Sequence, residues 1–286
     1  MTGSGNGPYA LQLNQIRSID GSNSAGTPGQ GAAGTALLRL SPPAYPGDGS
    51  GEEIVSSPDR ANPRTISNVI VSQGDQSIPN SRRMTNYVWA WGQFVDHDLD
   101  LTGTNPANGT ADIEIDDVND PIGPNPIPFD RSNFVAGTGT AGNPRQHANE
   151  ITAFIDASNV YGSDSARATG LRTGTGGLLK ISTGDLLPFN VDGFDNAGGP
   201  SATLFFAGDV RSNENVMLMS LHTLFVREHN RLATLPALLD PSASDELLYQ
   251  TASKIVAAEI QAVTYREFLP ALMGPAAPNP SQINFN

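Results

Sequence analysis

Three stretches of the chain repeat apolar residues with the period of a helix, and they predict the main helical elements. The first ends in the segment 89–101, where one apolar stripe is formed by Val88, Trp91 and Val95. The second lies within 206–233 and carries a long stripe: Met217, Leu221, Leu224 and Phe225. The third has a wide apolar face: Leu248, Ala252, Ile255, Val256, Ile260 and Val263.

Capping residues mark the starts of two of these helices. Ser244 is predicted to cap the third helix, with Asp245 and Glu246 in its first turn, where carboxylates favour the positive end of the helix dipole. Asn80 or Ser81 is predicted to cap the first helix.

The segments outside the helices are predicted to be loops. Residues 1–60 are rich in Gly, Ser, Pro and Asn and indicate an extended arm on a folded body; a flexible linker is the alternative. The acidic run Asp112–Asp120 alternates like a surface strand and lacks the glycine and terminal glutamate of an EF-hand loop, so we expect a solvated face there. The chain thus divides into an arm (1–60), a body (61–274) and a Pro/Asn-rich tail (275–286).

Composition excludes several classes of function. The 286 residues suffice for one large domain or two small ones, and 30 Gly with 22 Pro indicate many loops. A formal net charge of −13 with 16 Lys and Arg gives no basic surface for nucleic acid or an anionic membrane. The absence of Cys excludes disulfides and zinc–thiolate sites. No apolar run of about 18 residues predicts a membrane span, and the first residues do not resemble a classical signal peptide.

Candidate chemistry is concentrated at the end of the first helix. Gln93 and His97 are four residues apart and stack on one face, while Asp96 and Asp98 flank His97 on other sides. One short element can therefore direct an imidazole and a carboxylate to different places. A histidine among acids can equally be a solvated ion pair.

A second candidate site lies in the segment 152–158. Its alternate residues are Thr152, Phe154, Asp156 and Ser158. In an extended backbone they point the same way and gather hydroxyl, carbonyl and carboxylate oxygens, the ligands that calcium prefers. Without other information, a loop with an Asx turn is the default.

The segment Trp91–Thr102 resembles the distal-histidine segment of the animal haem peroxidase family, within the peroxidase–cyclooxygenase superfamily. Segments 149–164 and 206–233 match the same family in the same order, and the resemblance extends from about Leu11 to Gly274. It implies a mainly α, peroxidase-like helical fold with long irregular loops and an extended N-terminal arm. It also implies that the body holds the distal half of the domain and that a C-terminal part is missing.

The resemblance assigns roles to individual residues. His97 becomes the distal acid–base, Arg211 the distal cation, and Gln93 a donor to a distal water or halide. Asp96 and Glu214 match the two carboxylates that form ester links to haem b. Some members form a third, sulfonium link from a Met after this Glu. Here the residue is Asn215, so that link is expected to be absent.

The resemblance also implies a Ca²⁺ site. Its ligands would be Asp98, Thr152, Phe154, Asp156 and Ser158. The ion would tie the distal helix to a distant loop and so fix His97 from the neighbouring residue.

The four histidines limit what these 286 residues do alone. The family's proximal histidine lies C-terminal to the position of Asn286, whereas His222 and His229 match positions that are not ligands and are expected to be hydrogen-bonded structural histidines. His147 has no predicted role. We therefore expect this chain by itself to bind haem poorly and to be inactive.

The expected function is a haem-dependent peroxidase that reduces hydrogen peroxide and oxidises small organic, halide or pseudohalide donors. Two alternatives remain: the fatty-acid dioxygenase branch of the superfamily, and a non-catalytic, calcium-stabilised adhesion or interaction module. The Asp-His-Asp triplet and both ester carboxylates favour the peroxidase. An extracellular location, reached without a classical N-terminal signal, is also expected. The electron donor and the oligomeric state are not indicated.

Overall fold

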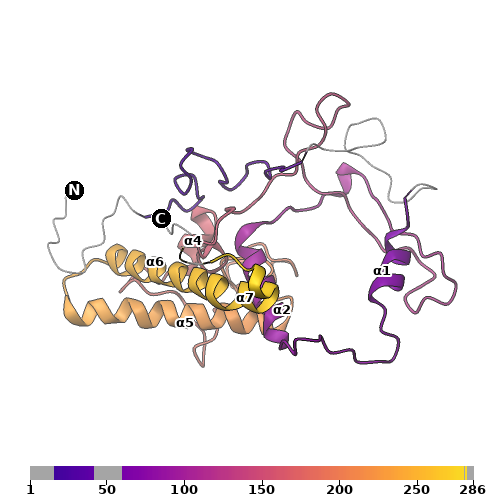
Figure 1. Ribbon diagram of the computed structural model, residues 1–286. Helices are drawn as coiled ribbons and strands as arrows, with labels where there is room; N and C mark the ends of the chain where they lie inside the picture. Colours follow the sequence, from indigo (N-terminus) through magenta and orange to yellow (C-terminus); the bar gives the residue numbers. More distant parts are fainter. Residues whose placement is uncertain (1–15, 42–59, 280, 282–286) are drawn as a thin grey trace. The chain divides into compact units, whose positions relative to one another are not determined.

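The computed structural model describes residues 16–41, 60–279 and 281, which form two compact units (Figure 1). The helical unit comprises the described residues among 16–33, 84–100 and 151–281, and the loop unit comprises those among 34–83 and 101–150. The helices of the helical unit are α2 (Asn86–Leu99), α3 (Ser158–Tyr161), α4 (Ser165–Leu171), α5 (Val216–Leu239), α6 (Asp245–Val263), the π-helical turn η3 (Thr264–Phe268), α7 (Leu269–Met273) and η4 (Gly274–Ala276). The loop unit contains α1 (Pro63–Val71) and η2 (Pro106–Asn108).

β-Structure in the described ranges is limited to isolated bridges. The prediction of a mainly helical fold with long irregular loops is therefore confirmed. None of the described helices combines the length and apolar character required to cross a bilayer. Parts of the predicted arm and tail, residues 1–15, 42–59, 280 and 282–286, lie outside the described residues, and the division into arm, body and tail stays a prediction.

The core of the helical unit lies where α2, α5 and α6 meet. Figure 1 shows α5 and α6 side by side, with α2 against α5. Phe94 of α2 is fully buried and stacks on Phe225 of α5 with ring centroids 5.3 Å apart. Trp91 donates its indole N–H to Thr264 Oγ1 over 3.2 Å and so joins α2 to η3. These contacts fix the angular position of α2, and therefore the direction of each of its polar side chains.

The end of α2 agrees with the sequence, but its start does not. The helix ends at Leu99, and Trp91 and Val95 are buried as the apolar stripe predicts. The prediction of a cap at Asn80 or Ser81 is wrong, because α2 begins at Asn86 and its N-cap residue, Thr85, forms no side-chain cap. The first residues of α2, Asn86 and Tyr87, are exposed.

The helix α5 differs from its prediction in two ways. It spans Val216–Leu239, whereas it was expected within 206–233, and Arg211 and Glu214 lie in the turn before it. Its buried face includes Leu218, whereas Leu224, predicted to be buried, is 53% exposed. The apolar residues of α5 extend beyond one face, and packing against α2, α3 and α6 decides which of them are covered.

The helix α6 follows its prediction closely. Ser244 caps it by accepting a hydrogen bond from Leu247 N over 3.2 Å. Four of the predicted apolar residues are buried at nearly one-turn spacing: Leu248, Ala252, Val256 and Ile260. Ile255, expected on this face, is 39% exposed, because it lies at the edge of the stripe.

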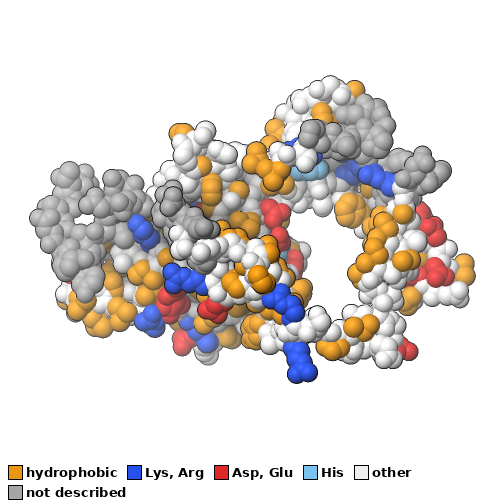
Figure 2. Space-filling view, in the orientation of Figure 1, with side chains coloured by type: hydrophobic (Ala, Val, Ile, Leu, Met, Phe, Trp, Pro, Cys, Tyr) orange, Lys and Arg blue, Asp and Glu red, His pale blue; other side chains and the backbone are white. Residues whose placement is uncertain are grey.

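The loop unit contains one buried ion pair that the acidic composition did not predict. Asp120 was expected in a solvated run, but its carboxylate is buried and accepts hydrogen bonds from Arg64 Nε and Nη2 over 2.7 and 2.8 Å and from Asn68 Nδ2. The hydrogen bonds from Arg64 and Asn68 hold the pKa of Asp120 well below its usual value. The other acids of the run are exposed, as expected: Asp112, Glu114, Asp116 and Asp117. The apolar side chains of Val69 and Ile70 on α1 are exposed. Figure 2 shows hydrophobic side chains at the surface of this unit.

Candidate functional site

The last two turns of α2 direct four predicted site residues to different sides. His97 and Asp98 are buried, Gln93 is half-buried, and Asp96 is exposed. Successive residues of a helix are about 100° apart. The buried imidazole and the buried carboxylate therefore face different neighbours.

His97 lies beside a buried acid that the sequence analysis did not single out. Its Nδ1 atom is 3.6 Å from Oδ1 of Asp209, which is longer than a hydrogen bond but close enough for electrostatic attraction. Burial lowers the pKa of His97 to about 4, although the charge of Asp209 acts in the opposite direction. The imidazole is therefore neutral at physiological pH and able to accept a proton.

Asp209 also binds Arg211. Arg211 Nε donates to Oδ1 over 3.0 Å and Nη2 donates to Oδ2 over 2.9 Å, which is a bidentate pair. A further bond from Arg211 Nη2 to the carbonyl oxygen of Asp100 over 2.9 Å fixes the guanidinium to the end of α2. Burial acts to raise the pKa of Asp209, but the hydrogen bonds and the charge of Arg211 have the larger effect, and the pKa of Asp209 is lowered. One buried carboxylate thus organises His97 and Arg211.

The local sequence explains how Asp209 reaches this position. A Cβ on Gly208 would lie 2.4 Å from the carbonyl carbon of Val160, so only glycine permits the close approach to α3. Asp209 N then donates to the carbonyl oxygen of Asn159, and Asp209 Oδ1 accepts from Arg211 N. An acid two residues before Arg211 is the pattern of an Asx turn, and this was the available signal. The proximity to His97 could not be read from the sequence.

The two carboxylates predicted to bind haem lie at the exposed side of the site. Glu214 accepts a hydrogen bond from Gln93 Nε2 over 2.7 Å. Asp96 lies one turn before Asp100. Partial shielding from water, together with the charge of Asp100, raises the pKa of Asp96 to about 6.

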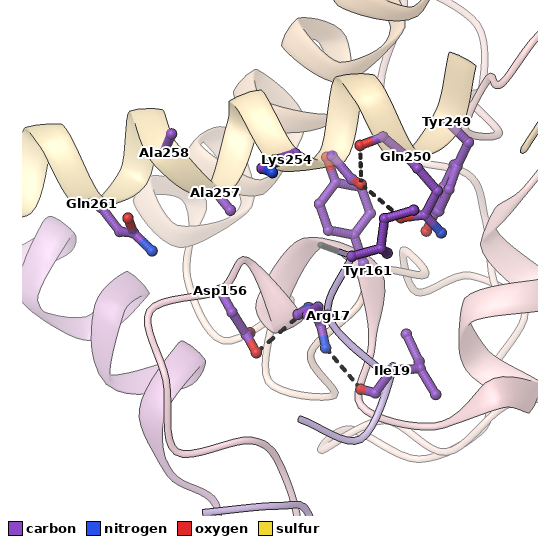
Figure 3. Close-up of a pocket in the computed structure, with 12 residues that line it drawn as sticks. Arg17, Ile19, Asp156, Tyr161, Tyr249, Gln250, Lys254, Ala257, Ala258 and Gln261 are labelled. Carbon is purple, nitrogen blue, oxygen red and sulfur yellow. Dashed lines mark hydrogen bonds and ion pairs between the residues drawn. The ribbon is translucent and has the colours of Figure 1, made fainter. Parts of the chain in front are cut away.

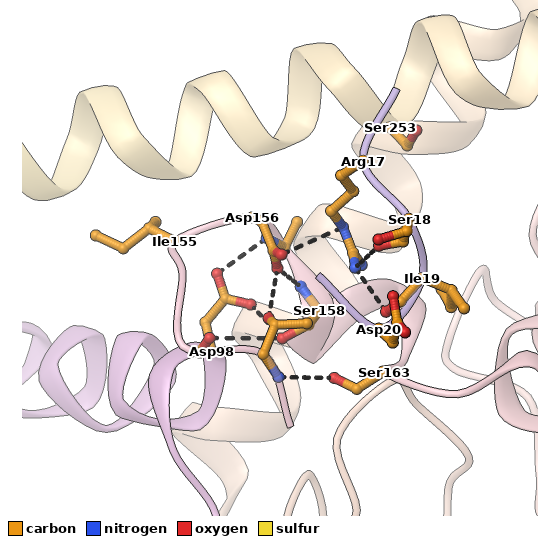
Figure 4. A network of polar contacts seen from close by, with 12 residues as sticks. Arg17, Ser18, Ile19, Asp20, Asp98, Ile155, Asp156, Ser158, Ser163 and Ser253 are labelled. Atoms are coloured by element: carbon orange, nitrogen blue, oxygen red, sulfur yellow. Dashed lines mark hydrogen bonds and ion pairs between the residues drawn. The ribbon is translucent and has the colours of Figure 1, made fainter. Parts of the chain in front are cut away.

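Four of the five predicted calcium ligands, Asp98, Thr152, Asp156 and Ser158, meet on the other side of α2. Figure 4 shows Asp98, Asp156 and Ser158 of this cluster. Asp98 Oδ1 accepts from Ser158 Oγ over 2.9 Å, and Asp98 Oδ2 accepts from Ala157 N over 2.9 Å. Asp156 Oδ1 accepts from Thr152 Oγ1 and from Ser158 N, both over 3.0 Å. The left-handed conformation of Ala157, with φ of 65°, turns the loop so that its N–H faces Asp98.

The chemistry of this cluster fits a hard cation. Burial and the charge of Asp156 raise the pKa of Asp98 to about 7, and burial also raises the pKa of Asp156. Asp156 Oδ2 is buried and forms no hydrogen bond; its counter-charge is Arg17, whose Nε is 3.5 Å away. The described residues contain no group of three or more acidic or histidine side chains suited to a metal. Hydroxyl and carbonyl oxygens would therefore have to complete the coordination shell of a cation bound by Asp98 and Asp156. The Phe154 carbonyl oxygen accepts from Asp156 N over 3.0 Å.

Two further histidines, His222 and His229, lie in the core of the helical unit. His229 is buried and forms hydrogen bonds with Tyr161 Oη and the Gly177 carbonyl oxygen, as predicted. The same prediction is wrong for His222, which is 1% exposed, packs against Phe94, and has no hydrogen bond at either ring nitrogen. His147 belongs to the loop unit. The expectation from the resemblance that His222 and His229 are not haem ligands stays a prediction.

A cavity of about 300 Å³ lies elsewhere in the helical unit, between residues 16–19 and α6 (Figure 3). Arg17, Asp156, Tyr249 and Lys254 are among its lining residues. His97 and Arg211 are not. It is therefore separate from the distal site.

A helical fold that brings His97 and Arg211 together on the buried Asp209 carboxylate agrees with what the resemblance to the animal haem peroxidases implies. The chain belongs to the animal haem peroxidase family, whose family model matches residues 16–285. This confirms the family predicted from the three sequence blocks.

Individual relatives agree with this assignment. Thyroid peroxidase of Canis lupus familiaris is 33% identical over a region that covers 94% of this chain and 34% of that protein. Myeloperoxidase of Mus musculus is 37% identical, with 92% of this chain and 42% of that protein covered. The chain thus spans well under half of the length of these relatives.

Solved structures show the same fold. Peroxidase A from Dictyostelium discoideum superposes with a TM-score of 0.77 at 29% identity, covering 90% of this chain and 53% of that chain. A fatty acid alpha-dioxygenase of Arabidopsis thaliana has a TM-score of 0.71 at 22% identity and covers 90% of this chain and 37% of that chain. The second similarity concerns the fold alone.

Proposed function

We propose that this chain forms the distal half of a haem-dependent peroxidase that reduces hydrogen peroxide and oxidises small organic, halide or pseudohalide donors. The observation that carries the proposal is the shared Asp209 carboxylate, which brings the His97 imidazole and the Arg211 guanidinium together. Bound haem b would supply the iron that accepts peroxide and the electrons that cleave its O–O bond.

The chain's own residues would handle protons and charge. His97, neutral and with Nδ1 beside Asp209, would accept a proton from one peroxide oxygen at Nε2 and return it to the departing oxygen. Arg211 would stabilise the negative charge that develops during cleavage. Gln93 would donate a hydrogen bond to a distal water or halide. Asp96 and Glu214 would hold the haem rim through ester links, with hydrogen peroxide as the oxidant that their formation requires.

We further propose that Asp98, Thr152, Phe154, Asp156 and Ser158 hold Ca²⁺. The supporting observation is the pair of buried carboxylates, Asp98 and Asp156, surrounded by hydroxyl and backbone groups. The ion would neutralise this pair and fix the end of α2. We also propose that the protein is extracellular.

Haem titration tests the main proposal. Hemin is added to the 286-residue chain with free imidazole in solution, which can serve as an axial ligand. A Soret shift that hydrogen peroxide then changes is expected, and this change is expected to be lost in Arg211→Ala but kept in His147→Ala. No Soret shift under these conditions, or an unchanged peroxide response in Arg211→Ala, contradicts the proposal.

The alternatives give different results in the same preparation. A dioxygenase, suggested by the fold similarity alone, would convert a polyunsaturated fatty acid to an oxygenated product that mass spectrometry detects. A non-catalytic module would bind Ca²⁺ without any Soret shift.

A further inference from the structure

Three directed hydrogen bonds run in series through the start of α5, the half-buried Gln93 of α2 and Glu214 in the turn before α5. The first runs from Leu218 N to Asn215 Oδ1 over 2.9 Å. The second runs from Asn215 Nδ2 to Gln93 Oε1 over 2.9 Å. The third runs from Gln93 Nε2 to Glu214 Oε2 over 2.7 Å. We call these bonds the amide relay.

The first bond determines the direction of the other two. A backbone N–H can only donate, so the atom of Asn215 that faces Leu218 has to be the side-chain oxygen. Its NH₂ group then faces Gln93 and has to meet an acceptor. This places Oε1 of Gln93 toward Asn215 and Nε2 toward Glu214, whose carboxylate accepts. The orientation of the Gln93 amide is therefore imposed from the helix backbone.

We propose that Asn215 is a positioning residue that holds Gln93 with its NH₂ group toward Glu214 and the distal site. A primary amide has two N–H donors, and the bond to Glu214 uses one of them. The group that Gln93 offers to a ligand is then an N–H donor and not a carbonyl oxygen. Such a donor favours a small anion or the lone pair of water.

The functional part of this inference rests on the proposed haem site, but the relay itself is a property of the chain without haem. Asn215 is also the N-cap of α5. If Asn215 had a purely structural role, capping α5 would be its whole function. The two roles are separable, because Ser, Asp and Asn are comparable N-caps, whereas only Asn brings an NH₂ group to Gln93.

The substitutions Asn215→Ser and Asn215→Asp give different expectations. Asn215→Ser keeps the cap and removes the donor to Gln93 Oε1, so the Gln93 amide is held only by its bond to Glu214 and should become more mobile. Asn215→Asp keeps the cap and faces Gln93 with a second oxygen. The Gln93 amide should then reverse, with Nε2 toward residue 215 and Oε1 toward the Glu214 carboxylate, which breaks the bond to Glu214. Ser244→Asn, which exchanges the cap of α6 far from Gln93, is the matched control.

The test is ¹H–¹⁵N NMR of the glutamine side-chain amides in the haem-free 286-residue chain. Hydrogen exchange of the Gln93 NH₂ should accelerate by about fivefold to tenfold in Asn215→Ser, as expected for the loss of one hydrogen bond. Exchange at Leu218 N should stay as slow as in the wild type, and Ser244→Asn should leave Gln93 unchanged. Equal protection of Gln93 in wild type, Asn215→Ser and Asn215→Asp would overturn the proposal.

A kinetic measurement on haem-loaded protein tests the functional part. In Asn215→Ser, the KM for iodide should rise, while the rate of the peroxide-dependent Soret change stays the same. An unchanged KM for iodide would refute the assignment of Asn215 to donor binding. If the chain shows no Soret shift but Gln93 responds to the substitutions as expected, the proposed haem function fails and the relay stands.

Discussion

Oδ1 of Asp209 lies 3.6 Å from Nδ1 of His97, although the two residues are on separate elements. The same oxygen accepts a hydrogen bond from Arg211 Nε over 3.0 Å. A negative charge at this place favours the histidine tautomer with hydrogen on Nδ1. Nε2 then remains as the basic atom. Asp209 thereby orients the two groups that are proposed to act on peroxide.

The substitution Asp209→Asn should destabilise the chain, because it leaves the mostly buried Arg211 guanidinium without its counter-charge. We expect a loss of about 3 kcal/mol in the free energy of unfolding, measured by urea denaturation. Glu228→Gln, which breaks an exposed ion pair with Arg231 on α5, is the control and should cost at most about 0.5 kcal/mol. Equal effects of the two substitutions would show that Asp209 has no organising role.

The substitution His97→Ala should slow the peroxide-dependent Soret change of haem-loaded protein by about a thousandfold or more, since it removes the proposed acid–base. Stopped-flow absorbance measures this rate. His147→Ala, in the loop unit, should leave it unaltered. A His97→Ala protein that reacts at the wild-type rate would exclude His97 from the proton transfer.

Calcium should stabilise the chain through Asp98. The ionised carboxylates of Asp98 and Asp156 repel each other inside the protein, and a divalent cation removes this repulsion. At a Ca²⁺ concentration about 100 times the Kd, the expected gain is about 2.7 kcal/mol, seen as a higher Tm. Asp98→Asn should abolish the gain, and Asp116→Asn, an exposed acid of the loop unit, should keep it. A Tm that does not depend on calcium in the wild type would refute the site.

The unpaired His222 predicts a specific pH dependence of stability. Burial lowers the pKa of His222 to about 4, with the charge of Asp209 opposing this effect and the charges of His97 and Arg211 adding to it. The unfolded chain therefore binds a proton near pH 6.5 that the folded chain binds only near pH 4. The stability contributed by neutral His222 is present above pH 6.5 and is lost as the pH falls toward 4.

The substitution His222→Leu should reduce this loss. Between pH 6.5 and 4.5 the free energy of unfolding of the variant should fall less steeply with decreasing pH than that of the wild type. The two slopes should differ by up to about 1.4 kcal/mol per pH unit. At pH 7 the substitution should be nearly neutral, because neither ring nitrogen forms a hydrogen bond. The control, His229→Leu, should cost about 2 kcal/mol at pH 7, since it leaves Tyr161 Oη without its partner. Urea unfolding at several pH values measures both. Identical slopes for wild type and His222→Leu would disprove the assignment.

The sequence alone determined the features that depend on neighbours a few residues away. The cap at Ser244, the buried face of α6 and the end of α2 follow from side chains one turn apart and from local hydrogen bonds. The residue types at 97, 98, 152, 156 and 158 identified two candidate sites, because few combinations of side chains suit acid–base chemistry or a hard cation. The family assignment came from the same short segments.

Only the tertiary structure decided which distant groups meet. It placed Asp209 beside His97 and left His222 without a hydrogen bond to the described residues. It also put Arg211 in the turn before α5, buried Leu218 and left Leu224 exposed. The physical reason is that each of these outcomes depends on the relative positions of α2, α3 and α5. Those positions are determined by packing between segments more than 50 residues apart along the chain, about which local periodicity carries no information.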